Sequence, residues 1–106
     1  MMVVTSETIA NKRIVKTLGL VRGNTVRARH IGKDIMAALR NIVGGEVHEY
    51  AKLIAEAREQ SLDRMVAEAE SLGANAIIAT RFTTSVMMGG AAELLAIGTA
   101  VIVEDS

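Results

Sequence analysis

The clearest pattern in the chain is a helical one between residues 46 and 72. Apolar side chains recur there every three or four residues, and at about 100° per residue they fall on one face of a helix. The glycine that follows, Gly73, suits the left-handed conformation in which many helices end. The pattern therefore predicts one long amphipathic helix. Its apolar face consists of Val47, Tyr50, Ala51, Ile54, Leu62, Met65, Ala69 and Leu72, and its polar face of Glu49, Lys52, Glu56, Glu59, Asp63 and Glu70.

Two strands are predicted after this helix, in "ANAIIATRFTTSV" and "AELLAIGTAVIVE". The glycines of the connection between them, residues 87–90, can adopt a positive φ. We expect an antiparallel sheet that includes residues 76–86 and 92–103. On one face of the second strand, Ala96, Gly98 and Ala100 follow one another between Leu94 and Ile102. Such small side chains leave room for a helix to lie close against this strand.

The N-terminal half contains a basic extended stretch and a second, shorter helix. "RIVKTLGLVRGNTVRA" is rich in Ile, Val, Leu and Thr, which favours one long strand or a hairpin. Gly19 and Gly23 indicate a bulge, and residues 22–24 a turn. Residues 2–5 fit a short edge strand, and "KDIMAALRNIV" has helical spacing. Together these elements predict a single α+β domain over residues 1–106, with two layers in which the long helix packs on an antiparallel β-sheet.

The composition narrows what such a domain can be. Half of the 106 residues are apolar, but only Tyr50 and Phe82 are aromatic, so the core is aliphatic and thin, and oligomerisation would supplement it. The chain has no cysteine, which excludes disulfides, thiolate nucleophiles and thiolate metal sites. The N-terminus lacks the pattern of a signal peptide, and no apolar stretch approaches the ~20 residues of a membrane helix. We expect a soluble cytoplasmic protein that does not bind a membrane.

Charge is divided unevenly along a chain of zero net charge. Residues 1–45 carry eight Lys and Arg against two acids, and residues 46–106 carry four against ten. A nucleic-acid surface would explain the basic half, but no aromatic side chains are interleaved with the cations to stack on bases, which disfavours nucleic acid. We expect instead that the two halves complement each other, within a subunit or between copies in a head-to-tail homo-oligomer.

One residue of the long helix does not fit its face. Arg58 lies four residues after Ile54 and four before Leu62, with Ser61 beside it, so we expect it to be mostly buried and hydrogen-bonded. Three interpretations stay open. It caps strand carbonyls at an edge; it pairs with a carboxylate, for which Glu93 is the best placed acid, including across a subunit interface; or it binds an anionic ligand. Arg58, Tyr50 and Glu93 are the candidate ligand-binding or interface residues.

The stretch "GGEVHEY" raises the question of a metal or anion site at the start of the helix. Glu46 and Glu49 already complement the positive end of the helix dipole, so an external anion would be repelled. Chelation on a helix face needs partners three or four residues apart, and His48 has no ligand at those offsets. His30 has Asp34 four residues on, with a glycine between them. The weak metal candidates are therefore His30, Asp34 and His48, and a site would have to be assembled from several segments or subunits with oxygen or imidazole ligands.

Several motifs of the chain are specific enough to suggest a family. They are Gly44-Gly45-Glu46, Tyr50, Glu56-Ala57-Arg58, Gly73-Ala74-Asn75-Ala76 and Gly98-Thr99-Ala100-Val101. These motifs resemble those of the YbjQ-like family, small bacterial and archaeal proteins of unknown function, and the similarity runs from the strand with Gly19 and Gly23 to Val103. The resemblance implies a dodecin-like subunit fold, assembly into a ring-shaped homopentamer and, from the family's label, binding of heavy metals. One departure is Ile97, where the family usually has an aromatic residue.

The sequence leaves three functions open, all of them without catalysis. The first is a ring-forming binding protein that holds metal ions. The second is a ring that binds a small organic or anionic ligand at subunit junctions, and the third is a purely structural or partner-binding oligomer. We do not expect an enzyme, because neither histidine has a nucleophile at a meaningful spacing. The sequence contains no identifiable cofactor motif, and the binding of a metal ion stays an open alternative.

Overall fold

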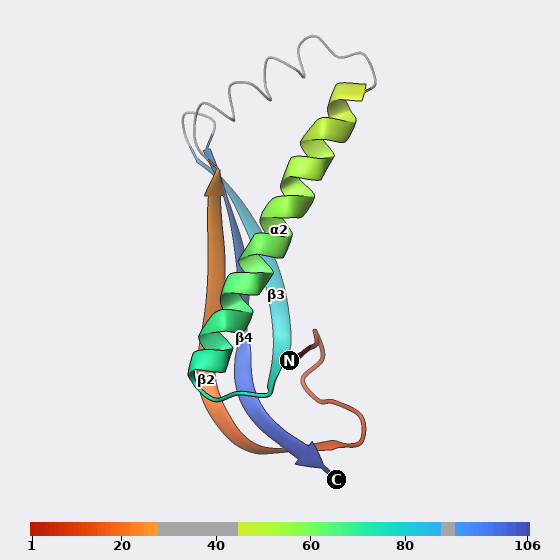
Figure 1. Cartoon of the computed structure of the whole chain (residues 1–106), viewed down its shortest axis with the longest axis vertical. Coiled ribbons are helices and arrows are strands. Elements are labelled where there is room, and N and C mark those ends of the chain that lie inside the picture. The colour runs from red at the N-terminus through yellow and green to blue at the C-terminus, as the bar shows by residue number, and fades with distance from the viewer. Residues whose placement is uncertain (28–44, 88–90) are drawn as a thin grey trace.

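The structure is a computed structural model that describes residues 1–27, 45–87 and 91–106. It contains the strands β1 (Met2–Val3) and β2 (Lys12–Arg27), the helix α2 (Gly45–Ser71), and the strands β3 (Ala76–Met87) and β4 (Ala91–Asp105) (Figure 1). The long helix and the two strands after it confirm the sequence prediction. The shorter helix predicted in "KDIMAALRNIV" lies outside the described residues.

The four strands form one sheet in the order β1-β3-β4-β2. β4 lies between β2 and β3 and is antiparallel to both, whereas β1 runs parallel to β3 through Met2↔Ala76 and Val3↔Ile77. The fold is therefore α+β, as expected, but the sheet is mixed and not wholly antiparallel. The difference arises because the N-terminus enters alongside β3 in the same direction, where the amide of Val4 donates to the carbonyl of Ile77.

β2 is one continuous strand, so the hairpin and the turn at residues 22–24 were wrong alternatives. Its register against β4 shifts between Thr17 and Gly19, and Gly19 has a φ of +122°. This confirms a bulge at Gly19, in a conformation that favours glycine. Gly23 has a different role, which lies in the packing of the helix.

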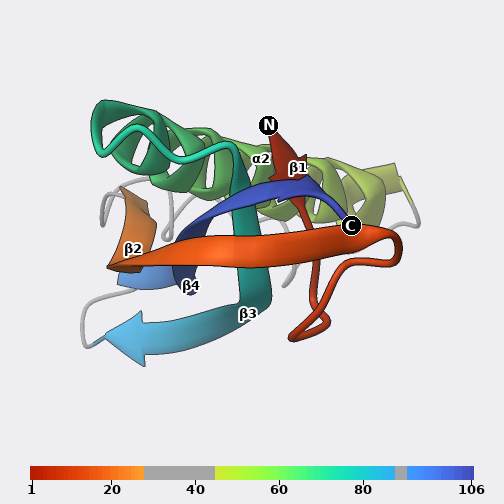
Figure 2. The same cartoon turned by 90° about the horizontal axis from the view of Figure 1, so that it is seen from below.

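α2 covers one face of the sheet, mainly over β2 and β4 (Figure 2). A Cβ atom added to Gly23 would lie 2.2 Å from the carbonyl oxygen of Ser61 and 2.4 Å from the amide nitrogen of Met65. The helix backbone therefore approaches the sheet most tightly at β2, and not at the small residues of β4 as the sequence suggested. Gly98 makes room for a side chain instead, because its added Cβ would lie 2.6 Å from Cγ2 of Ile77. The buried core cluster consists of Val21, Met65, Ala69, Ile77, Ala96 and Ala100.

The helix ends in a hydrogen-bonded turn of the Schellman type. Gly73 has a φ of +84°, and its amide donates to the carbonyl of Glu70. The next amide, of Ala74, donates to the carbonyl of Ala69. These two bonds satisfy carbonyls that the helix end would otherwise leave open, which confirms the predicted role of Gly73.

The molecule is long and thin. Its principal extents are 55 × 24 × 16 Å and its Cα radius of gyration is 17.1 Å, against about 13 Å for a compact chain of this length. In Figure 1 the first turns of α2 lie well clear of the strands. Within the described parts of the chain, no helix is both long enough and apolar enough to span a membrane.

Candidate functional site

Arg58 is exposed in the subunit, so the expectation that it is buried was wrong. The buried ridge of α2 is formed by Ala57, Ser61, Met65 and Ala69, and Arg58 lies about 60° around the helix axis from Ser61. The helix is rotated relative to the prediction because it packs against Gly23, where only a close backbone fits. Leu72, another predicted core residue, lies just after the last residue of α2 and is 46% exposed.

Ser61 takes the central position that the sequence assigned to Arg58. Its hydroxyl is fully buried and lies 2.9 Å from Oγ1 of Thr25, 3.0 Å from the carbonyl oxygen of Ala57 and 3.0 Å from that of Leu94. Thr25 is itself only 3% exposed. This small polar cluster links α2 to β2 and β4. The sequence signal was present, since Thr25 alternates with Val21 and Gly23 along one strand face, but the pairing required the tertiary structure.

Glu93 does not meet Arg58 within the subunit. It is half-buried on β4, next to the fully buried Leu94, so it lies on the face of the sheet away from α2. Its Oε2 accepts a hydrogen bond of 3.2 Å from Nδ2 of Asn24. Pairing between Arg58 and Glu93 of different subunits stays a prediction.

The capping of strand carbonyls, one of the roles considered for Arg58, belongs to other arginines. Nη1 of Arg64 donates to the carbonyl of Asn24 at 2.5 Å. Nη1 of Arg81 donates to the carbonyls of Thr5 and Thr80, each at 2.8 Å. Arg64 thus fixes α2 to β2, and Arg81 fixes the N-terminal segment to β3.

None of the metal candidates has its side chain in the described part of the structure, so their grouping stays a prediction. His30 and Asp34 lie outside the described residues. His48 and the interface candidate Tyr50 have their backbone in the first turns of α2, while their side chains lie outside what is described. Among the described residues, no group of three or more His, Asp or Glu side chains could hold a metal ion. A metal site would therefore need residues from further segments or from more than one subunit.

The face of the sheet away from α2 carries exposed side chains to which no role has been given so far. The register places Ile97 between Arg22 on β2 and Arg81 on β3, and both arginines are exposed. On the same face, Leu20 is 58% exposed and Val26 is 52% exposed. We call this surface, which combines cations with apolar side chains, the outer face. It is suited to packing against another chain or to contact with an anion.

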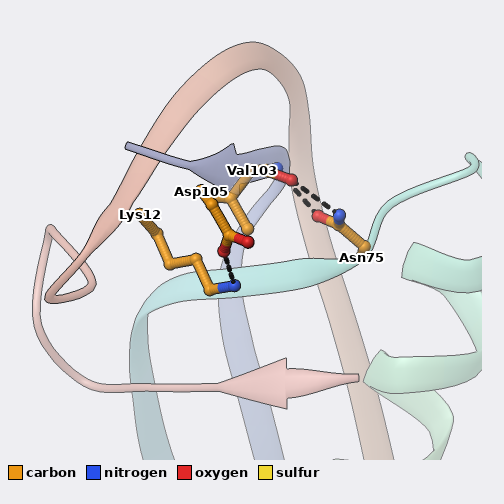
Figure 3. A network of polar contacts seen from close by, with 4 residues as sticks. All are labelled: Lys12, Asn75, Val103 and Asp105. Atoms are coloured by element: carbon orange, nitrogen blue, oxygen red, sulfur yellow. Dashed lines mark hydrogen bonds and ion pairs between the residues drawn. The ribbon is translucent and has the colours of Figure 1, made fainter.

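A second polar cluster lies at the opposite end of the sheet (Figure 3). The side chain of Asn75 donates through Nδ2 to the carbonyl of Val103 and accepts through Oδ1 from its amide, both at 2.8 Å. Nζ of Lys12 lies 2.5 Å from Oδ1 of Asp105, and this hydrogen bond and the charge of Lys12 lower the pKa of Asp105 below its ordinary value of 3.8. These groups bind the chain to itself, so this cluster is structural.

Comparison with known proteins gives a family match along nearly the whole chain. The model of the YbjQ family, described as "Putative heavy-metal-binding", matches residues 1–104. A UPF0145 protein of Methanosarcina acetivorans is 56% identical over 101 residues, which cover 95% of this chain and 95% of the relative. A UPF0145 protein of Dehalococcoides mccartyi is 58% identical over 104 residues, which cover 98% and 100%.

A solved structure supports the fold. It is the crystal structure of a protein of unknown function from Pediococcus pentosaceus, of the family DUF74, with a TM-score of 0.65 and 14% sequence identity over 98% of both chains. At that identity the likeness concerns the fold alone. The family itself rests on the sequence matches, and by them the chain belongs to the YbjQ family of UPF0145 proteins.

Proposed function

We propose that this protein is a homo-oligomeric binding protein, assembled as a closed ring, which holds a metal ion and does not act as an enzyme. The observation that carries the proposal is the amount of surface that the single subunit leaves exposed. Its accessible area is 6826 Å², against about 5,700 Å² for a compact monomer of 11.3 kDa. The excess of about 1,100 Å² is comparable with the ~800 Å² that each partner buries in a stable interface.

The kind of surface supports association as well. Leu20 and Val26 are exposed on the outer face, and Phe82 is 46% exposed beside Ala96, on the face that α2 covers only in part. The uneven charge of the two halves of the chain favours contact between unlike surfaces. Unlike surfaces give a head-to-tail contact, which forms a ring when its rotation closes. Five subunits are the number that the family resemblance implies.

The metal part of the proposal rests on the family's description together with the ligand types in the chain. With no cysteine, the ligands available are imidazole and carboxylate groups, which suit zinc, copper or nickel when histidine contributes. His30, Asp34 and His48 are the candidates. Since the described residues of one subunit contain no cluster of three such groups, a ring would be needed to bring ligands from neighbouring copies together.

Native mass spectrometry of untreated protein tests both parts at once, because it reports stoichiometry and retained ligand together. We expect one oligomeric species with bound metal, verified by elemental analysis.

Calorimetric titration of demetallated protein with zinc, copper and nickel should then show sub-micromolar binding that is weakened in His48→Ala. A monomer at micromolar concentration in physiological salt would refute the ring. An intact oligomer without metal, and without affinity for these ions, would refute the metal and favour an organic or anionic ligand.

A further inference from the structure

The two long edges of the sheet are protected along only half of their length. We call the part of the sheet built on residues 100–105 of β4 the lower half, and the part built on residues 91–99 the upper half; they lie at the bottom and top of Figure 1, respectively. In the lower half, β1 pairs with the outer edge of β3. The segment after β1 continues this cover, since the amides of Ala79 and Thr80 donate to the carbonyls of Ser6 and Val4.

The opposite edge of the lower half is protected in a different way. β2 has two register irregularities there, between Ile14 and Lys16 and between Thr17 and Gly19. Its exposed side chains include Arg13 and Lys16. Bulges and cations are the devices by which edge strands avoid pairing with other chains.

Among the described residues, the upper half has neither a covering strand nor a bulge along residues 20–27 of β2 or 81–87 of β3, although Arg22 on β2 and Arg81 on β3 are exposed cations. Residues 20–27 of β2 pair with β4 without interruption, and so do residues 81–87 of β3. Both segments flank the same stretch of β4, from residue 91 to 99. Among the described residues, nothing pairs with their outer sides. The β3 segment continues from Arg81 with uncharged side chains that include Thr83, Thr84 and Ser85, which favour strand pairing and do not repel it.

We propose that residues 20–27 of β2 in one copy add to residues 81–87 of β3 in the next copy and extend the sheet from subunit to subunit. This inference rests on the proposed homo-oligomer and names the contact that builds it. In each subunit, β2 then pairs with β3 of one neighbour and β3 pairs with β2 of the other neighbour, at the same level of the sheet. A closed head-to-tail ring requires such a contact between unlike edges. Because β2 and β3 both run antiparallel to β4, the new pair is parallel.

The two symmetric alternatives would each leave edges unpaired. Two β2 edges pairing with each other would leave both β3 edges open. Two β3 edges pairing would leave both β2 edges open. Pairing β2 with β3 closes every open edge of the upper half at once.

Disulfide formation between introduced cysteines tests the contact on a background that has no native cysteine. Thr83→Cys is combined in turn with Arg22→Cys, Asn24→Cys or Val26→Cys, which sample the register on the outer face. Asn24 and Thr83 both pair with Leu95, on its two sides, so within a subunit they are about 10 Å apart. This exceeds the ~7 Å limit for a disulfide, so any bond must join two copies.

We expect at least one double variant, oxidised with diamide, to lose its monomer band and give a series of linked species that ends at the ring size. Each single variant, and the matched control of Thr83→Cys with Lys16→Cys in the lower half, should stay monomeric on a denaturing gel.

If Asn24→Cys alone gives a linked dimer, two β2 edges pair with each other and the proposed β2–β3 contact is wrong. Absence of links in all three double variants, with an oligomer still seen by light scattering, would overturn the edge pairing but leave the oligomer standing. A monomer by light scattering would overturn both.

Discussion

The lower and upper halves of the sheet differ in how they are held. The lower half satisfies its polar groups within the chain: Asn75 bonds both backbone groups of Val103, Lys12 pairs with Asp105, and Arg13 pairs with Glu104. In the upper half the helix packs on Gly23, Arg64 bonds the carbonyl of Asn24, and the side chain of Asn24 bonds Glu93.

This difference shows how one subunit combines a closed part with an open part. The closed end gathers the termini, the helix end and the strand ends; β1 covers its β3 edge, while register irregularities and cations protect its β2 edge. The open end keeps long, regular strands, and among the described residues no strand pairs with their outer edges. The proposed association would add burial to the thin aliphatic core.

The largest effect that we expect comes from Gly23→Ala in the upper half. The added methyl group would overlap backbone atoms of Ser61 and Met65, which cannot rotate away, so α2 must lift from the sheet. We expect a loss of about 3 kcal/mol or more in the free energy of unfolding, measured with urea at fixed protein concentration.

Gly19→Ala in the lower half is its control. Nothing lies within 4 Å of an added Cβ there, so the cost is limited to the strain of a positive φ, about 1–3 kcal/mol. If Gly23→Ala were no more damaging than Gly19→Ala, the tight helix contact would not determine the stability of the upper half.

Ser61→Ala should come next. It removes the buried hydroxyl that lies between Thr25 and the carbonyl of Leu94, and it leaves the hydroxyl of Thr25 without this partner. The expected loss is about 2 kcal/mol in the same unfolding experiment. Ser71→Ala, which removes an exposed hydroxyl bonded to the carbonyl of Glu68, should change the stability by less than about 0.5 kcal/mol. Equal losses for the two variants would contradict a special role for the buried cluster.

Asn75→Ala probes the lower half and should have a smaller effect, about 1–2 kcal/mol. Two hydrogen bonds to Val103 are lost, but the side chain is exposed and water can replace it. Hydrogen exchange should show faster exchange of the Val103 amide, with little change in the amides of residues 20–27. Equal acceleration at both ends would show that the two halves do not open independently.

The smallest effect concerns Asp105, which is fully exposed. Its lowered pKa means that the pairing with Lys12 contributes stability above the unfolded pKa, and this contribution is lost as the pH falls through the folded pKa. We expect a carboxyl titration followed by NMR to give a midpoint below 3.8, and Lys12→Met to move it upward. High salt should move it in the same direction. A midpoint that does not respond to Lys12→Met would remove the proposed cause.

Several features could be predicted from the sequence because they depend on neighbours along the chain. The period of residues 46–72, the strand composition of residues 76–86 and 92–103, and the glycine at residue 73 gave the helix, the two strands and the helix end. Those elements in turn gave an α+β domain. The family motifs could also be read directly, since they are local strings of residues.

Only the tertiary structure decided how these elements meet. The rotation of α2 depends on Gly23, which lies 38 residues before Ser61 in the chain, and it placed Ser61 in the core and Arg58 outside. The parallel pairing of β1 with β3 depends on where the N-terminus enters the sheet. The open edges of the upper half likewise follow from strand order, because hydrophobic periodicity reports which face of a strand is buried and carries no information on which edge is paired.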